Sequence, residues 1–175
     1  MDVVRKQILK LRGRIDIESH AGEGSTFYLK LPLTLAIING LVVSVGAERY
    51  IVPLFAVREM LRPAADAVFT IQNRSEMAMV RGRLLPIVRL HRVFGVIPKA
   101  TDPADALLIV AESDDRVFCV MVDELLGKQE VVIKSLGSMF EGVQGVAGGA
   151  ILGDGRVGLI LDLEGVFAQS AAPAT

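Results

Sequence analysis

The chain has 175 residues, of which 51% are apolar and 22% charged, and its formal net charge is −1. This length suits one domain, or one domain and part of another. Its many Val, Leu and Ile residues, together with 17 Gly and 7 Pro, favour short strands and tight turns over a helical bundle. The longest apolar stretch, 31–43, is interrupted by Pro32, Asn39 and Gly40, so we expect no membrane insertion.

Charge is divided unevenly along the chain. Residues 1–33 carry a net +2, residues 34–100 a net +5 and residues 101–175 a net −8. The basic middle lacks interleaved aromatic residues and known binding motifs, so we expect no nucleic-acid partner. The single cysteine, Cys119, lies in the apolar run 117–122, which predicts a buried, reduced thiol. This thiol and the lack of a basic-then-apolar leader pattern favour the cytoplasm.

Residues 1–33 have the pattern of a helix followed by two strands. Apolar residues at helical spacing run up to Gly13, where a helix commonly ends. Alternation then predicts a strand over 15–18 and, after a glycine-containing loop at 19–25, a second strand near Phe27. Such a segment is too small to form a core, so we expect it to be a piece of a larger domain.

The rest of the chain contains an internal repeat. The stretch 81–95 aligns with 154–168, and the earlier stretch 57–61 aligns with 122–126 in the same order. Each unit predicts short strands, a glycine turn, an apolar strand and a short closing helix. Two small β-barrels would bury such a sequence, because closure leaves no exposed strand edge.

The repeat also suggests where the barrels divide. Proline, threonine and aspartate cluster at 98–103, which is typical of a boundary. We therefore expect one subdomain over about 34–98 and a second over about 104–170.

Charges reverse at matched positions of the repeat. The matched pairs are Arg58 with Asp123, Arg81 with Asp154, Arg89 with Asp162 and His91 with Glu164. One interpretation is drift of solvated charges, which individually contribute little. The other is that two lobes with opposite potentials associate head-to-tail with copies or homologues. Both interpretations remain open.

No catalytic or metal-binding pattern is recognisable in the sequence. His20 and His91 have no further ligand at metal-binding spacing, and no nucleophile motif is present. The adjacent carboxylates at 123–124 would point to opposite faces of a strand, and residues 112–115 suit a hairpin tip. We therefore predict no catalytic residue, no metal site and no cofactor in this chain. A small enzyme that uses these carboxylates is the least favoured hypothesis.

Several stretches resemble the C-terminal part of CheA-type chemotaxis histidine kinases. Those similar to the end of the kinase ATPase domain are MDVVR at 1–5, LRGRIDIES at 11–19, GEGSTF at 22–27 and LPLTLAI at 31–37. Those similar to the CheW-like regulatory domain are VDELLGKQEVVIK at 122–134, GGAILGDGR at 148–156 and LILD at 159–162. The resemblance implies a mainly β fold. Residues 34–175 would form a CheW-like domain of two SH3-like β-barrel subdomains, and 1–33 a helix–strand–strand remnant of an α/β GHKL-type ATPase domain.

The same resemblance implies a function. The chain would be the regulatory and docking module of a sensor kinase, which uses ATP and magnesium to phosphorylate its own histidine. Its partners would be the adaptor CheW and the cytoplasmic tips of chemoreceptors in membrane-associated arrays, with head-to-tail or homodimer contacts left open. The implied partner-binding residues are Val57, Arg58, Glu59, Leu61, Arg81, Val122 and Leu126, with Glu59 paired to Arg81.

A remnant of the nucleotide site is also implied. The residues that match the last nucleotide motif of these kinases are Gly22, Gly24, Ser25 and Thr26. His20 stands where an acidic residue is expected, and the other ATP motifs of the family lie further upstream. We therefore expect this chain alone neither to bind ATP tightly nor to phosphorylate itself. The alternative is a free-standing CheW-type scaffold adaptor, although an adaptor has no use for residues 22–27.

Overall fold

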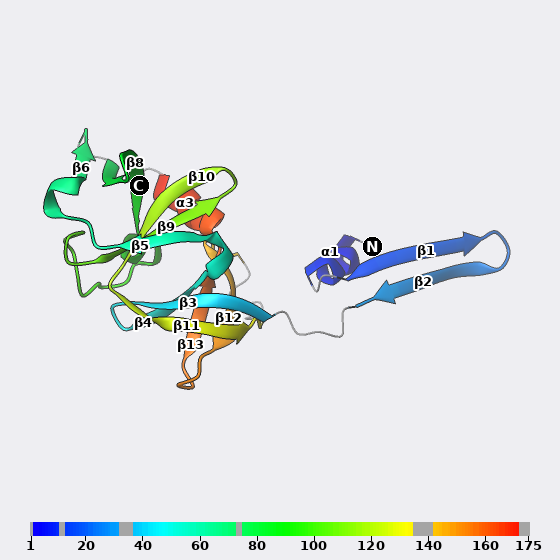
Figure 1. Ribbon diagram of the computed structural model, residues 1–175. Coiled ribbons are helices and arrows are strands. Elements are labelled where there is room, and N and C mark those ends of the chain that lie inside the picture. Colours follow the sequence, from blue (N-terminus) through cyan, green and yellow to red (C-terminus); the bar gives the residue numbers. More distant parts are fainter. Residues whose placement is uncertain (1, 11–12, 32–36, 73–74, 135–141, 172–175) are drawn as a thin grey trace. The chain divides into compact units, whose positions relative to one another are not determined.

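The computed structural model describes residues 2–10, 13–31, 37–72, 75–134 and 142–171. The chain divides into two compact units, Met1–Ala36 and Ile37–Thr175 (Figure 1). The predicted boundary between 33 and 34 falls outside the described residues.

The first unit confirms the predicted helix and two strands. Helix α1 (Asp2–Lys10) is followed by the antiparallel hairpin of β1 (Arg14–His20) and β2 (Gly24–Lys30). On one face of this hairpin Ile17 lies opposite Phe27, and both side chains are about half exposed. On the other face Lys30 Nζ lies 2.8 Å from Asp16 Oδ2, which lowers the pKa of that carboxyl. A half-exposed apolar face fits a segment that packs against further protein.

The described residues of the second unit form two sheets and two short helices. The six-stranded sheet has the order β5 (Val57–Leu61), β9 (Leu107–Ser113), β10 (Arg116–Val122), β8 (Arg83–Arg89), β7 (Ser75–Val80) and β6 (Val68–Ile71). The five-stranded sheet has the order β11 (Glu124–Val132), β3 (Ile37–Val45), β4 (Glu48–Pro53), β13 (Val157–Leu161) and β12 (Val146–Ile151). The helices are α2 (Leu90–Phe94) and α3 (Leu163–Ala171), with short 3-10 turns at Leu54–Ala56 and Ala65–Ala67.

We call these sheets the six-stranded lobe and the five-stranded lobe. Their strand orders are equivalent, with β5, β9, β10, β8 and β7 of one matching β11, β3, β4, β13 and β12 of the other. An isolated bridge between Lys134 and Gly149 joins the end of β11 to β12 and helps to close the five-stranded lobe. The lobes are two SH3-like barrel subdomains, as predicted.

The repeats are interleaved between the lobes. Hairpin β3–β4 of the first repeat lies beside β11 and β13 of the second, while hairpin β9–β10 lies beside β5 and β8 of the first. The predicted division into subdomains at 34–98 and 104–170 is therefore wrong. A sequence repeat identifies equivalent strands but not the sheet that each strand joins.

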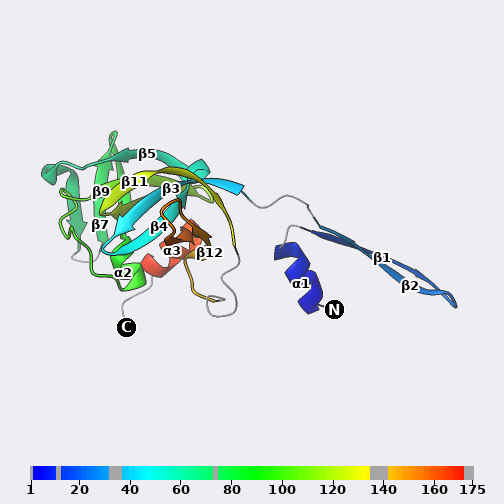
Figure 2. The same ribbon diagram turned by 90° about the horizontal axis from the view of Figure 1, so that it is seen from below.

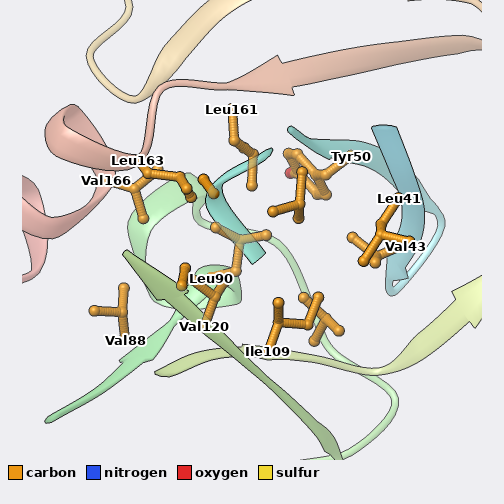
Figure 3. Close-up of a cluster of buried hydrophobic side chains, with 14 of the residues drawn as sticks. Leu41, Val43, Tyr50, Val88, Leu90, Ile109, Val120, Leu161, Leu163 and Val166 are labelled. Carbon is orange, nitrogen blue, oxygen red and sulfur yellow. The ribbon is translucent and has the colours of Figure 1, made fainter. Parts of the chain in front are cut away.

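The interleaved hairpins explain the long apolar runs in the sequence. Along β3, Leu41 and Val43 face the space between the lobes, while Val42 faces the interior of the five-stranded lobe. Strands β4, β9 and β10 alternate in the same way, so all four are buried on both faces. Figure 3 shows side chains from both lobes meeting in this interlobe core, with Ile109 and Val120 among them.

The closing helices pack on matched aromatic residues. Phe94 of α2 stacks on Tyr50 with ring centroids 5.0 Å apart, and Phe167 of α3 packs on Phe118 at 4.9 Å. Helices α2 and α3 also contact each other, and Figure 2 shows them on the same side of the unit. Among the described residues, no helix combines the length and apolarity needed to cross a membrane.

Candidate partner-binding site

The turn between β7 and β8 positions the central residue of the candidate site. Arg81 and Gly82 both have positive φ, 46° and 78°, which is the pattern of a type I′ hairpin turn. Glycine adopts this conformation without cost, whereas arginine there carries a penalty of about 1 kcal/mol. Turn geometry therefore does not explain why position 81 is an arginine.

The Arg81 side chain confirms the predicted pairing with Glu59 on β5. Its Nε donates to both carboxylate oxygens, at 3.1 Å and 3.0 Å. One nitrogen makes both contacts, and the Arg81 side chain is 82% exposed. Such a pair contributes less than about 1 kcal/mol to folding. The pair holds a guanidinium and a carboxylate together at the surface of the lobe.

Neighbouring predicted residues lie on the same lobe. The pairing of β5 with β9 shifts register between Val57 and Glu59, so Arg58 is an extra residue in a β-bulge. The exposed Arg58 side chain forms an ion pair with Glu112. Val57 and Leu61 are partly buried and pack on the hydrophobic core. The structure thus brings 57–61 and Arg81 together.

Two predicted partner-binding residues do not join this surface. Val122 is 1% exposed and packs in the interlobe core, so the predicted partner contact by its side chain is wrong. Leu126 is 43% exposed but lies on the five-stranded lobe, at a register shift between Leu125 and Gly127. The internal repeat matches 57–61 with 122–126, but burial differs at every matched position except that of Met60 and Leu125.

Asp123 is an internal anchor that the sequence did not predict. It is 5% exposed, and its carboxylate accepts hydrogen bonds from the backbone N–H groups of Gly46, Lys99 and Ala100 at 2.6, 2.8 and 3.3 Å. These bonds tie the β3–β4 turn and the segment after α2 to the single residue between β10 and β11. The one available signal was a carboxylate directly after the apolar run 117–122.

Arg89 is also used internally. Its side chain is 9% exposed, and Nε and Nη2 each donate to one carboxylate oxygen of Glu76, with the Nη2–Oε1 distance 2.7 Å. The hydrogen bonds from Arg89 lower the pKa of Glu76. Burial, reinforced by Arg89 and Arg92, lowers the pKa of His91 and favours its neutral form.

These contacts bear on the charge reversal between the repeats. Asp123 and Arg89 are satisfied inside the unit, and Asp154 Oδ2 lies 3.4 Å from Arg49 Nη2 on the same lobe. The hypothesis of two oppositely charged lobe surfaces therefore loses several of the charges on which it rested.

The predicted nucleotide-motif residues lie at the end of the β1–β2 hairpin. Gly22 and Gly24 have positive φ, and a Cβ added at either would meet no atom within 4 Å. Ser25 Oγ donates to Ser19 Oγ at 2.9 Å, and Thr26 is exposed on β2. An open hairpin end does not by itself form a nucleotide cradle, so the assignment of these residues to a remnant nucleotide site stays a prediction.

The remaining candidates for a reactive or metal-binding site are the Cys119 thiol and the acidic residues. Cys119 is buried as predicted, and burial, with a smaller effect of Glu59, raises the pKa of its thiol to about 12. Within the described ranges, no group of three or more His, Cys, Asp or Glu side chains could hold a metal ion.

Comparison with known proteins gives one family model and several relatives. The model of the CheW-like domain matches residues 39–171. The chain is 40% identical over 163 residues to chemotaxis protein CheA of Klebsiella aerogenes, covering 93% of this chain and 25% of that protein. It is 39% identical over 171 residues to CheA of Rhizobium meliloti, covering 97% and 23%. It is 41% identical over 163 residues to sensor histidine kinase CheAY of Helicobacter pylori, covering 93% and 20%.

The matches cover part of each relative and reach into the first unit of this chain. The chain spans a quarter or less of each of these three relatives. The unit Ile37–Thr175 accounts for 139 residues, so a match over 163 residues includes at least 24 residues of the first unit. Among solved structures, the scaffolding protein TtCheW from Thermoanaerobacter tengcongensis has the same fold, with a TM-score of 0.65 and 20% identity over 74% of this chain and 92% of that one.

Proposed function

The chain belongs to the family of CheW-like domains of CheA-type chemotaxis proteins, and on that basis we propose that it is the docking and regulatory module of a sensor histidine kinase. Membership of this family implies protein–protein interaction in chemotaxis signalling. In the longer parent, the module binds the adaptor CheW and the cytoplasmic tips of chemoreceptors. It thereby couples receptor state to ATP-dependent histidine phosphorylation and holds the kinase in receptor arrays.

The observation that carries this proposal is the similarity across the first unit. Histidine kinases of the CheA type match at least 24 of its residues, beyond the CheW-like domain itself. The hairpin of this unit leaves an apolar face half exposed at Ile17 and Phe27. That face fits the remainder of an ATPase domain, and a self-sufficient adaptor has no need of it.

The surface around Arg81 is the proposed docking surface. The Glu59–Arg81 pair contributes little to folding, and the backbone of Arg81 is in a costly conformation. Strands β7 and β8 leave Met79 and Leu84 partly exposed as cross-strand neighbours close to this turn. Apolar contact beside a charged pair is typical of protein–protein interfaces, in which methionine and arginine are enriched.

Calorimetric titration of the full chain with the CheW adaptor from the same source tests this proposal. We expect binding that weakens with added salt, and Arg81→Asn should weaken it about tenfold, because a partner loses its contact with the guanidinium. Arg83→Gln is the matched control, since Arg83 is exposed in the same hairpin and should leave the affinity unchanged. A chain that does not bind the adaptor would reject the docking role. Equal affinity of Arg81→Asn and wild type would reject this surface alone.

The fold similarity to TtCheW, which covers 92% of that scaffolding protein, supports a second candidate. The chain would then be a free-standing CheW-type scaffold adaptor. An antibody against the chain distinguishes the two candidates in cells of its source. A band near 18.8 kDa indicates the adaptor, and a band several times larger indicates the kinase.

For the isolated chain we expect no transfer of phosphate from labelled ATP, and measurable autophosphorylation would contradict that expectation.

A further inference from the structure

A basic depression lies on the five-stranded lobe, away from the Glu59–Arg81 pair. Its volume is about 490 Å³, which is in the range of pockets for small ligands. Three cationic side chains from separate parts of the chain line it: Arg49 on β4, Lys99 after α2 and Arg156 before β13. Glu124 at the start of β11 is the acidic side chain in the lining.

Two unpartnered polar atoms lie together in the wall of this depression. In the sheet, Glu124 pairs with Ser44 and Ser44 pairs with Arg49, so these three residues form one row across β11, β3 and β4. Ser44 is 7% exposed. Ser44 Oγ and Arg49 Nε are both buried, and neither has a hydrogen-bond partner among the described residues. Buried donors without partners are rare, and these two belong to residues that line the same depression.

The acidic groups nearby do not fully neutralise the depression. Arg49 Nη2 lies 3.4 Å from Asp154 Oδ2, and Lys99 Nζ lies 3.6 Å from Glu124 Oε1. Both separations exceed the roughly 2.7–2.9 Å of a charge-assisted hydrogen bond. Among the lining residues, three cations face one carboxylate, that of Glu124. The carboxylates of Asp154 and Asp123 lie outside the lining and contact Arg49 and three backbone N–H groups, respectively.

We propose that this depression is a binding site for a small oxyanion, of the phosphate or carboxylate class. An oxyanion offers several acceptor atoms, so it can accept hydrogen bonds from the partly exposed Arg49 guanidinium. Lys99 and Arg156 supply further positive charge at the rim. Glu124 opposes binding, because its carboxylate carries the same charge as the ligand and lies next to Ser44 in the row.

Titration of the full chain with inorganic phosphate, followed by amide chemical shifts at constant ionic strength, tests the proposal. We expect saturable shifts confined to residues 44–49 and 154–156. Arg49→Gln should weaken the phosphate affinity about tenfold, because it removes the donor at the base of the site. Arg156→Gln, at an exposed position where folding is not at risk, should weaken it about threefold. Glu124→Gln should strengthen it about threefold, because a competing charge is lost.

Arg83→Gln on the other lobe is the matched control and should leave the affinity unchanged. The proposal is overturned if phosphate at about 50 mM causes no localised shift beyond that of chloride at equal ionic strength. It is also overturned if Arg49→Gln and Arg156→Gln bind phosphate as tightly as the wild type. Adaptor binding is a separate measurement, so neither outcome depends on the docking proposal.

Discussion

Replacement of Asp123 by alanine should destabilise the second unit severely. The carboxylate accepts three backbone N–H groups, from Gly46, Lys99 and Ala100. Each buried donor left without a partner costs about 1–3 kcal/mol. The three donors are only part-buried, so water compensates some of this loss, and we expect a total cost of about 3–5 kcal/mol. Asp123→Asn should cost about 1–2 kcal/mol, because its amide oxygen still accepts from Gly46 and Lys99 but its NH₂ faces the N–H of Ala100.

Urea unfolding of the variants measures these costs. The midpoint should fall while the slope with urea concentration stays constant, since the surface exposed on unfolding is unchanged. Asp66→Ala is the control, because Asp66 is exposed, and it should change the free energy of unfolding by less than about 0.5 kcal/mol. A loss of less than about 1 kcal/mol in Asp123→Ala would refute the anchoring role. Adaptor affinity of Asp123→Asn should equal that of the wild type, and a clear loss would instead place Asp123 on the docking surface.

Three further predictions concern single side chains. Glu76→Gln leaves the buried Arg89 guanidinium without its counter-charge and should cost about 3 kcal/mol in urea unfolding. Because Arg89 lowers the pKa of Glu76, this contribution is complete above the ordinary glutamate pKa and is lost as the pH falls through the lowered value. An undiminished difference between wild type and variant at about pH 3 would contradict this. Cys119, with its pKa raised to about 12, should resist iodoacetamide at about pH 8 until the chain is unfolded, and labelling of the native protein would contradict its burial. Arg81→Asn should match or exceed the thermal stability of the wild type, since asparagine tolerates positive φ, and a lower melting temperature would show that the Glu59 contact matters for folding.

Local features of the chain predicted its local structure. Helical spacing predicted α1, and alternation with glycine positions predicted β1 and β2, because the period of apolar residues reflects the geometry of each element. The Glu59–Arg81 pair followed from a family resemblance. The two barrels followed from the internal repeat, whose aligned stretches correspond to equivalent strands in the two lobes. Burial of Cys119 followed from the apolar run around it.

The charges at matched positions of the repeat did not predict which charged side chains are exposed. The reversal between repeats suggested lobes of opposite potential, but Asp123 and Arg89 find their partners within the unit. Whether a charge is exposed depends on donors and acceptors far away in the chain, such as Gly46 for Asp123. The depression around Arg49 has the same origin, since Lys99 and Arg156 meet it only after folding.

The sequence by itself determined the class of fold, the repeat and the family of this protein, because turns, periodicity and long motifs are properties of neighbouring residues. Only the tertiary structure decided that β3–β4 and β9–β10 each join the lobe formed mainly by the other repeat. Both hairpins are apolar on two faces, so either arrangement would satisfy the pattern of burial. The choice between them depends on pairing between strands distant in sequence, on which local periodicity carries no information.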